Sequence, residues 1–145
     1  DSAVRYWGAM GLLMRGATSV GAAHVELTAA LQDTSPYVRI AAAESLGRFG
    51  RDADLSIALS TLTALADWRK HDVFIVFAAL HALEALGPKV APAKQAILAL
   101  PSTGPSPDGR YAAYVPRILE RLRSELGESS QDAAPAKAKK KRAKK

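Results

Sequence analysis

The histidines and the acidic residues beside them are the side chains whose types and spacing could do chemistry in this 145-residue chain. His24 and Glu26 have the His-x-Glu spacing of zinc deaminases, in which histidine binds the metal and glutamate transfers the proton. That site also needs cysteine ligands, and the chain contains no cysteine. We therefore expect His24 and Glu26 to lie on the polar face of a helix.

The other candidates for chemistry are weaker. Asp72 could orient His71 as a base, but it also has the position of a helix N-cap. His81 has no partner at a metal-ligand spacing, and neither a Gly-x-Ser-x-Gly motif nor a phosphate-binding glycine loop after a strand is present. The sequence predicts no catalytic residue, no metal site and no cofactor.

The elements that would position any site repeat along the chain. Asp1, Ser35 and Asp72 can each N-cap a helix, and they are 34 and 37 residues apart. A branched apolar residue, a small residue, a leucine and a glycine follow each cap at intervals of three, seven, eleven and fifteen. These residues are Val4, Val38 and Ile75; Gly8, Ala42 and Ala79; Leu12, Leu46 and Leu83; and Gly16, Gly50 and Gly87. The spacing predicts one packed helix face per copy and a left-handed glycine stop after it.

The composition predicts an all-α fold. Alanine and leucine, both strong helix formers, make up 46 residues, and no long segment alternates apolar and polar side chains. Helices are predicted at about 2–15, 20–32, 36–49, 53–67, 73–86 and 91–99, followed by a Pro-rich loop at 101–110 and a closing helix at 112–126 that Pro116 should kink or begin. We expect one helical module over 1–127 and a disordered Ala/Lys-rich cationic tail over 128–145.

The repeated Asp, cap, Val-Arg, Ala-Ala, Leu and Gly pattern resembles the short, bacterial kind of HEAT repeat. This resemblance implies an α-solenoid of stacked antiparallel helix pairs. It also implies that the arginines of the Val-Arg pairs, Arg5 and Arg39, bind aspartates at helix ends, a place occupied by Asp33 and Asp67. The third copy departs from the pattern because Val76 replaces the arginine.

Two groups of residues have a binding role as an alternative to packing. Arg5 and Arg39 could line a groove for an anionic ligand, although an Asp–Arg ladder between repeats is the simpler interpretation. Tyr37, Phe74 and Trp68 lie near helix starts and could form an aromatic interaction patch, although packing between repeats again explains them more simply.

The apolar pattern of the first helix, residues 2–15, indicates a solenoid that is incomplete at its N-terminus. This helix has no preceding partner helix in the chain, yet it is apolar nearly all round, so it needs cover on several sides. We expect an exposed apolar patch around Trp7 and Met14. The expected partner is an upstream domain of a longer parent protein or another protein.

Three segments, 1–9, 35–44 and 114–120, together resemble the HEAT-like region that follows the catalytic domain of bacterial sulfatases of the N-sulfoglucosamine sulfohydrolase/arylsulfatase type. The resemblance implies a parent that hydrolyses sulfuric esters and is periplasmic or secreted. Sulfatases need a Cys/Ser-x-Pro-x-Arg motif, but Ser35 and Pro36 are adjacent, and calcium-binding asparagines are absent. This chain would then be the non-catalytic scaffold of such an enzyme.

The net charge of +6 belongs to the tail. Residues 133–145 hold seven basic and no acidic residues, which leaves 13 basic and 14 acidic residues in the rest of the chain. Such a tail can bind sulfated glycans or nucleic acid weakly through Lys139, Lys140, Lys141 and Arg142, or simply aid solubility. The alternative function is therefore a polyanion-binding HEAT protein. The longest apolar run, 73–83, is too short to predict membrane insertion.

Overall fold

The computed structural model describes residues 1–127 of the chain. Within this range every regular element is helical, which confirms the all-α prediction. The elements are α1 (Ser2–Arg15), α2 (Ala17–Ala22), α3 (His24–Ala30), α4 (Pro36–Phe49), α5 (Asp52–Leu65), α6 (Val73–Leu86), the 3-10 helix η1 (Gly87–Ala93), α7 (Lys94–Leu98), α8 (Gly109–Ala112) and α9 (Tyr114–Glu125).

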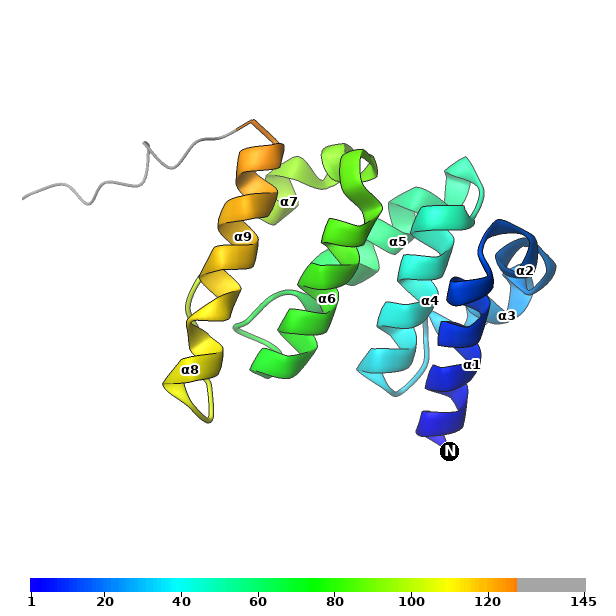
Figure 1. Ribbon diagram of the computed structural model, residues 1–145, viewed down its shortest axis with the longest axis horizontal. Helices are drawn as coiled ribbons and strands as arrows, with labels where there is room; N and C mark the ends of the chain where they lie inside the picture. Colours follow the sequence, from blue (N-terminus) through cyan, green and yellow to red (C-terminus); the bar gives the residue numbers. More distant parts are fainter. Residues whose placement is uncertain (128–145) are drawn as a thin grey trace, which may run out of the picture.

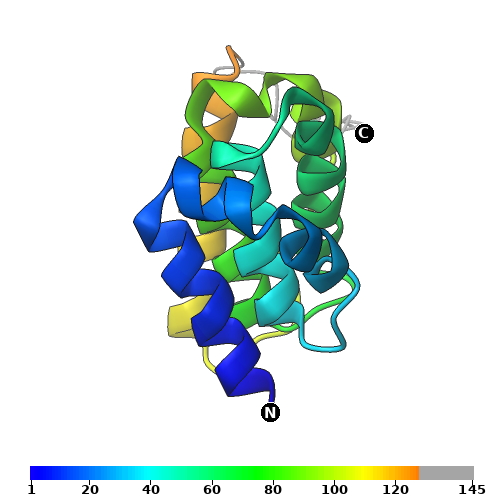
Figure 2. The same cartoon turned by 90° about the vertical axis from the view of Figure 1, so that its right-hand side faces the viewer.

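The helices form two rows, as Figures 1 and 2 show. The first row holds α1, α4, α6 and α9 side by side in chain order, and each helix contacts the next. The second row holds α2 with α3, then α5, then η1 with α7, each followed in the chain by its first-row partner. The arrangement is an α-solenoid of three stacked pairs, with α1 added at one end.

The last pair is a fourth copy of the repeat that the sequence analysis missed. Asp108 lies 36 residues after Asp72, and its carboxylate accepts a hydrogen bond from the Arg110 N–H at the start of α8. The buried residues of α9 occupy the positions of the buried residues of α6 at the same interval. The matched pairs are Ala79 with Val115, Leu83 with Leu119, and Leu86 with Leu122. Pro116 lies in the first turn of α9 and does not kink it, because no residue of that turn donates within the helix.

Two predicted helices of the second row are wrong in detail. The helix predicted at 20–32 is split at Ala23, two residues after Gly21, which is a weak helix former. The helix predicted at 91–99 starts instead as η1, because Pro88 and Pro92 lack the N–H groups of a regular α-helix.

The helix caps follow the prediction in two copies of three. Asp1 and Asp72 accept first-turn N–H groups, and Gly16 and Gly87 have positive φ values of 76° and 55°. In the second copy both details are wrong. The Ser35 side chain caps nothing, and Gly50 has a φ of −74°. A Cβ on Gly50 would collide with the Leu46 carbonyl oxygen, so close approach rather than left-handed backbone requires glycine there.

The core lies between the rows and between neighbouring pairs. The repeated face of α4 is fully covered, with Val38, Ala42 and Leu46 each at most 1% exposed. The small residue at its centre lets α1 approach closely. Trp68 is also 1% exposed: its Nε1 donates to the Pro105 carbonyl at 2.8 Å, and the Gly104 backbone lies against the indole ring. Trp68 therefore has the packing role, and it anchors the Pro-rich loop.

One stretch, Val73–Leu98, is long and apolar enough to cross a membrane by length and composition. In this structure it is not one straight helix. It consists of α6, η1 and α7, with a change of direction at Gly87, and seven residues of α6 are buried in the core. Burial inside the solenoid explains its hydropathy, and the absence of membrane insertion stays a prediction.

Candidate interaction surface

The predicted ladder between repeats forms at its first rung. Arg5 of α1 binds the carboxylate of Asp33 with two hydrogen bonds, 2.6 Å from Nε to Oδ2 and 2.9 Å from Nη2 to Oδ1. Asp33 also accepts the Ser35 backbone N–H at 2.8 Å, which takes the place of the predicted Ser35 cap. The hydrogen bonds from Arg5 and Ser35 lower the pKa of Asp33 to about 2. Arg5 therefore joins α1 to the start of α4.

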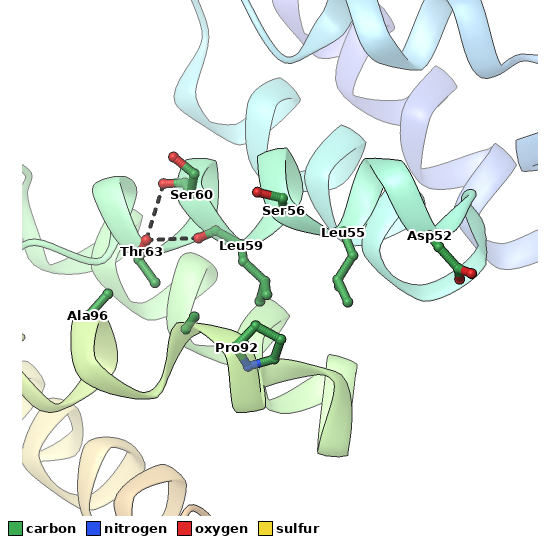
Figure 3. A pocket seen from close by; sticks show the side chains of 9 residues that line it. Asp52, Leu55, Ser56, Leu59, Ser60, Thr63, Pro92 and Ala96 are labelled. Carbon is green, nitrogen blue, oxygen red and sulfur yellow. Dashed lines mark hydrogen bonds between the residues drawn. The ribbon is translucent and has the colours of Figure 1, made fainter.

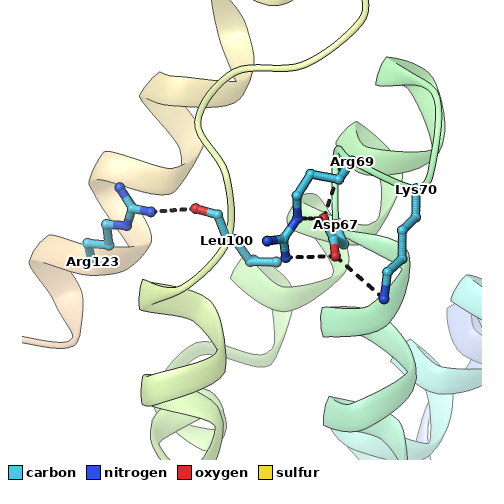
Figure 4. Close-up of polar contacts among 5 residues, drawn as sticks. All are labelled: Asp67, Arg69, Lys70, Leu100 and Arg123. Atoms are coloured by element: carbon cyan, nitrogen blue, oxygen red, sulfur yellow. Dashed lines mark hydrogen bonds and ion pairs between the residues drawn. The ribbon is translucent and has the colours of Figure 1, made fainter.

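The second predicted rung, between Arg39 and Asp67, is wrong. Asp67 is held by Arg69 at 2.8 and 2.9 Å and lies 3.7 Å from the Lys70 ammonium (Figure 4). These two cations belong to the three-residue insertion that lengthens the interval between caps from 34 to 37. They satisfy Asp67 locally, and the buried Nε atom of Arg39 has no hydrogen-bond partner in the described part of the chain.

Acid is expected to weaken this fold through Asp33 and Asp67. Both carboxyl groups have a folded pKa of about 2 against an ordinary value of 3.8, because arginine hydrogen bonds favour the charged form. The two ionised carboxylates therefore contribute to the free energy of unfolding above about pH 4, and this contribution is lost as the pH falls towards 2.

Chemical denaturation at several pH values checks this expectation. The variants Asp33→Asn and Asp67→Asn should each flatten the loss of stability between pH 4 and 2. Glu125→Gln, which removes an exposed carboxylate, is the control and should keep the slope. An unchanged slope in both aspartate variants would contradict the role of these ion pairs.

The histidines take structural positions. The His24 Nε2 atom lies 2.9 Å from Asp54 of α5, so it joins neighbouring helices of the second row and does not pair with Glu26. Burial raises the pKa of Asp54, but hydrogen bonds from His24 and the Arg51 N–H outweigh that effect and lower it. His81 is exposed and lies 3.0 Å from Glu84. No group of three metal-binding side chains occurs among residues 1–127.

Six of the nine aromatic residues, five on first-row helices and one on α8, define a surface that we call the aromatic face. Its members are Tyr6, Tyr37, Phe74, Phe77, Tyr111 and Tyr114. The rings of neighbouring helices touch: Phe74 and Tyr111 lie 5.0 Å apart between centroids, and Phe77 and Tyr114 lie 6.0 Å apart. These ring contacts join α6 to α8 and α9.

The aromatic face remains accessible after the repeats have packed. Tyr37, Phe74 and Tyr114 are 40%, 44% and 47% exposed. No tyrosine hydroxyl of the described residues makes a hydrogen bond to the protein, and burial raises the pKa of Tyr37. Packing therefore explains only part of this surface. Tyr37 and Phe74 stay accessible, and an interaction role for these two side chains stays a prediction.

Two shallow grooves meet at the α1 end of the aromatic face. One, of about 310 Å³, crosses α1, α4 and α6, with Met10, Ile40 and His81 in its walls. The other, of about 340 Å³, lies at the starts of α1 and α4 beside Ser2 and Ser35. Tyr6 and Tyr37 line both grooves, so their hydroxyls are placed to bind a ligand lying across the first row.

A third groove, of about 470 Å³, lies on the second row between α5 and η1 with α7 (Figure 3). Leu55 and Leu59 supply its apolar wall, and Ser56, Ser60 and Asp52 supply its polar atoms. The Thr63 hydroxyl donates to the Leu59 carbonyl of its own helix. Asp52 is the single ionisable side chain lining this groove, so the groove holds no pair of groups for acid–base catalysis.

The end of the solenoid carries the apolar patch that the sequence predicts. Trp7 is 66% and Met14 is 80% exposed, which confirms this prediction, and Val4 is 71% exposed. The four predicted tail residues Lys139, Lys140, Lys141 and Arg142 lie outside the described residues.

The fold and these surfaces define a helical-repeat protein of the scaffold and interaction class. The family model for HEAT repeats matches residues 24–115, which is more than half of the chain. The chain therefore belongs to the HEAT repeat family. No curated protein and no solved structure gave a significant match in the corresponding comparisons.

Proposed function

We propose that this chain is a non-catalytic interaction module that binds another protein through its aromatic face. The observation that carries this proposal is the row of half-exposed tyrosine and phenylalanine rings across four stacked helices. Such rings supply large contact areas at a low cost in side-chain entropy, and tyrosine hydroxyls add hydrogen bonds. Aromatic residues are for that reason enriched in protein interfaces.

The solenoid contributes a fixed spacing to this surface. Each of these aromatic side chains stands on a helix that packs against at least one neighbouring helix, so the binding of a partner needs little further ordering of the backbone. The mechanism is thus geometric: a rigid stack presents anchors from separate repeats to one partner.

A pull-down with matched variants tests the proposal. The triple variant Tyr37→Ala, Phe74→Ala, Tyr114→Ala should lose the proteins that the native chain retains, while its thermal unfolding changes little because these side chains are half-exposed. The control is Val25→Ala with Ile57→Ala, which trims exposed apolar residues elsewhere. Retention of the same proteins by the triple variant would refute the proposal.

A finer proposal concerns the parent protein. The order of the three segments that resemble the C-terminal region of bacterial sulfatases supports a parent of that type, with this chain supporting the catalytic domain. The proposal rests on that resemblance alone. A Cys/Ser-x-Pro-x-Arg motif encoded upstream of Asp1 would support it, and a different catalytic signature there would end it.

The cationic tail supports a second candidate function, binding of a polyanion such as a sulfated glycan or nucleic acid. Truncation after Gln131 removes seven basic residues. We expect the truncated chain to lose affinity for heparin and for duplex DNA, since both depend on charge density.

Fluorescence titrations at several salt concentrations measure this effect. The native chain should show a slope of log K against log salt of up to about 6 for DNA, near 0.9 for each neutralised phosphate. Equal affinity of the truncated and native chains would exclude the tail as the binding element.

A further inference from the structure

The outer side of α1 is an apolar helix face that no other described helix covers. Val4, Trp7, Gly11 and Met14 follow one another at intervals of three, four and three residues, which is the spacing of a helix–helix seam. The three large side chains are 66–80% exposed. Beside them an apolar groove of about 710 Å³ runs between α1 and α3, and Val38 of α4 also lines it.

The equivalent face of α4 shows how such a face is covered. Val38 of α4 is the repeat equivalent of Val4, and it is 1% exposed because α1 lies over it. Ala42 and Ser45, the equivalents of Gly8 and Gly11, are fully buried in that contact. The outer face of α1 therefore has the residue sizes of a close helix contact.

No packing contact among residues 1–127 requires the glycines of α1. A Cβ added to Gly8 or to Gly11 would meet no atom within 4 Å, and both have φ values open to any residue. Glycine is the weakest helix former after proline, so two of them within one exposed helix weaken it. A large side chain of another molecule that packs against this stretch of backbone would account for the two glycines, because it needs the space that they leave open.

The opposite end of the solenoid does not match this face. The buried residues of α9 contact α6 and α7. After Tyr114 the exposed positions of α9 are polar, among them Arg117, Ser124 and Glu125. Head-to-tail stacking of copies would press the apolar face of α1 onto these charged residues. An isologous contact, in which the same face meets itself about a two-fold axis, avoids that cost.

We propose that two copies of this chain associate through α1, with the two α1 helices antiparallel. In that register Trp7 of each copy lies over Gly11 of the other, and Val4 lies over Met14. The largest side chain of the face thus meets the position that has no side chain. Because the axis is two-fold, the contact is formed twice and closes the assembly at a dimer.

The charges at the groove fit the same symmetry. Arg5, with its side chain 45% exposed, lies at the end of the groove where it holds Asp33. Glu26 is exposed on the other wall, seven residues before Asp33 and so towards the opposite end. An antiparallel two-fold contact brings Arg5 of each copy towards Glu26 of the other.

Sedimentation equilibrium of the full chain tests the proposal. We expect a species of twice 15.4 kDa that dissociates on dilution. Trp7→Glu should weaken association at least a hundredfold by placing a charge in the seam. Gly11→Leu should weaken it at least tenfold by filling the space for Trp7. Leucine is the better helix former, so at dilutions where the native chain is monomeric this variant should unfold at no lower temperature than the native chain, which separates loss of contact from loss of folding.

Ile57→Glu is the control, because Ile57 is 43% exposed on α5, away from α1. It should leave the dimer unchanged. A chain that stays monomeric up to its solubility limit overturns the proposal, and so does a dimer that survives both α1 variants or that Ile57→Glu abolishes. Tyr37, Phe74 and Tyr114 are not part of this contact, so the pull-down result of their triple variant is independent of these outcomes.

Discussion

Replacing Trp68 by alanine is expected to lower the free energy of unfolding by about 3–5 kcal/mol. Trp68 is the largest fully buried side chain of the described residues. The substitution removes its packing against Gly104 and also its hydrogen bond to the Pro105 carbonyl. Because the collapse of the Pro-rich loop can fill only part of the space, most of the transfer free energy is lost with the indole.

Urea denaturation, followed by circular dichroism, measures this effect. The chain offers a matched control, since its other tryptophan, Trp7, is 66% exposed. At dilutions where the chain is monomeric, Trp7→Ala should change stability by about 0.5 kcal/mol or less, as surface substitutions do. Equal losses from the two variants would mean that Trp68 does not hold the loop as described.

Trp68→Phe divides the Trp68 effect into its two parts. Phenylalanine keeps much of the ring packing but has no N–H group to offer Pro105. We expect it to retain most of the stability and to lose about 0.5–1.5 kcal/mol for the hydrogen bond, together with a smaller packing loss.

The second large effect is expected at the repeated leucine. Leu83→Ala should cost about 2–5 kcal/mol, because Leu83 is completely buried between neighbouring pairs. Leu12 has the equivalent position in the first copy but is only partly buried, since it borders the open groove at the end of the solenoid.

Leu12→Ala is therefore expected to cost clearly less than Leu83→Ala in the same urea experiment. The comparison holds the residue type and repeat position constant and varies only the cover supplied by a neighbouring pair. If the two substitutions cost the same, the core is not built from contacts between adjacent repeats.

The first-row helices were predictable because their signals are local. The predicted limits of 2–15, 36–49 and 73–86 agree with α1, α4 and α6. Each of these helices follows a residue of a capping type and is followed by a glycine, and each carries its apolar residues at helical spacing, so a short segment contains the information. The Arg5–Asp33 pair was predicted from the resemblance to HEAT repeats, in which the arginine of the Val-Arg pair binds an aspartate at a helix end.

The second row and the fourth copy were harder to predict because their signals are weak or interrupted. The split at Ala23 has no proline or cap to mark it. The fourth copy was hard to recognise because its cap, Asp108, lies in the Pro-rich loop and Pro116 lies in the helix that follows. That helix, α9, is the one that corresponds to α6. The cap of this copy and its three buried leucine or valine positions were visible in the sequence at an interval of 36.

The sequence by itself determined the all-α class, the repeat, the first-row helices and the apolar face of α1. Helix propensity, caps and periodicity act within a few turns of chain, so they need no distant partner. Only the tertiary structure decided which side chains compete for a partner and which stay exposed. Arg39 lost Asp67 to the nearer Arg69, and Tyr37 and Phe74 remained half-exposed after packing. Both outcomes depend on distances between separate helices, which spacing along one chain does not contain.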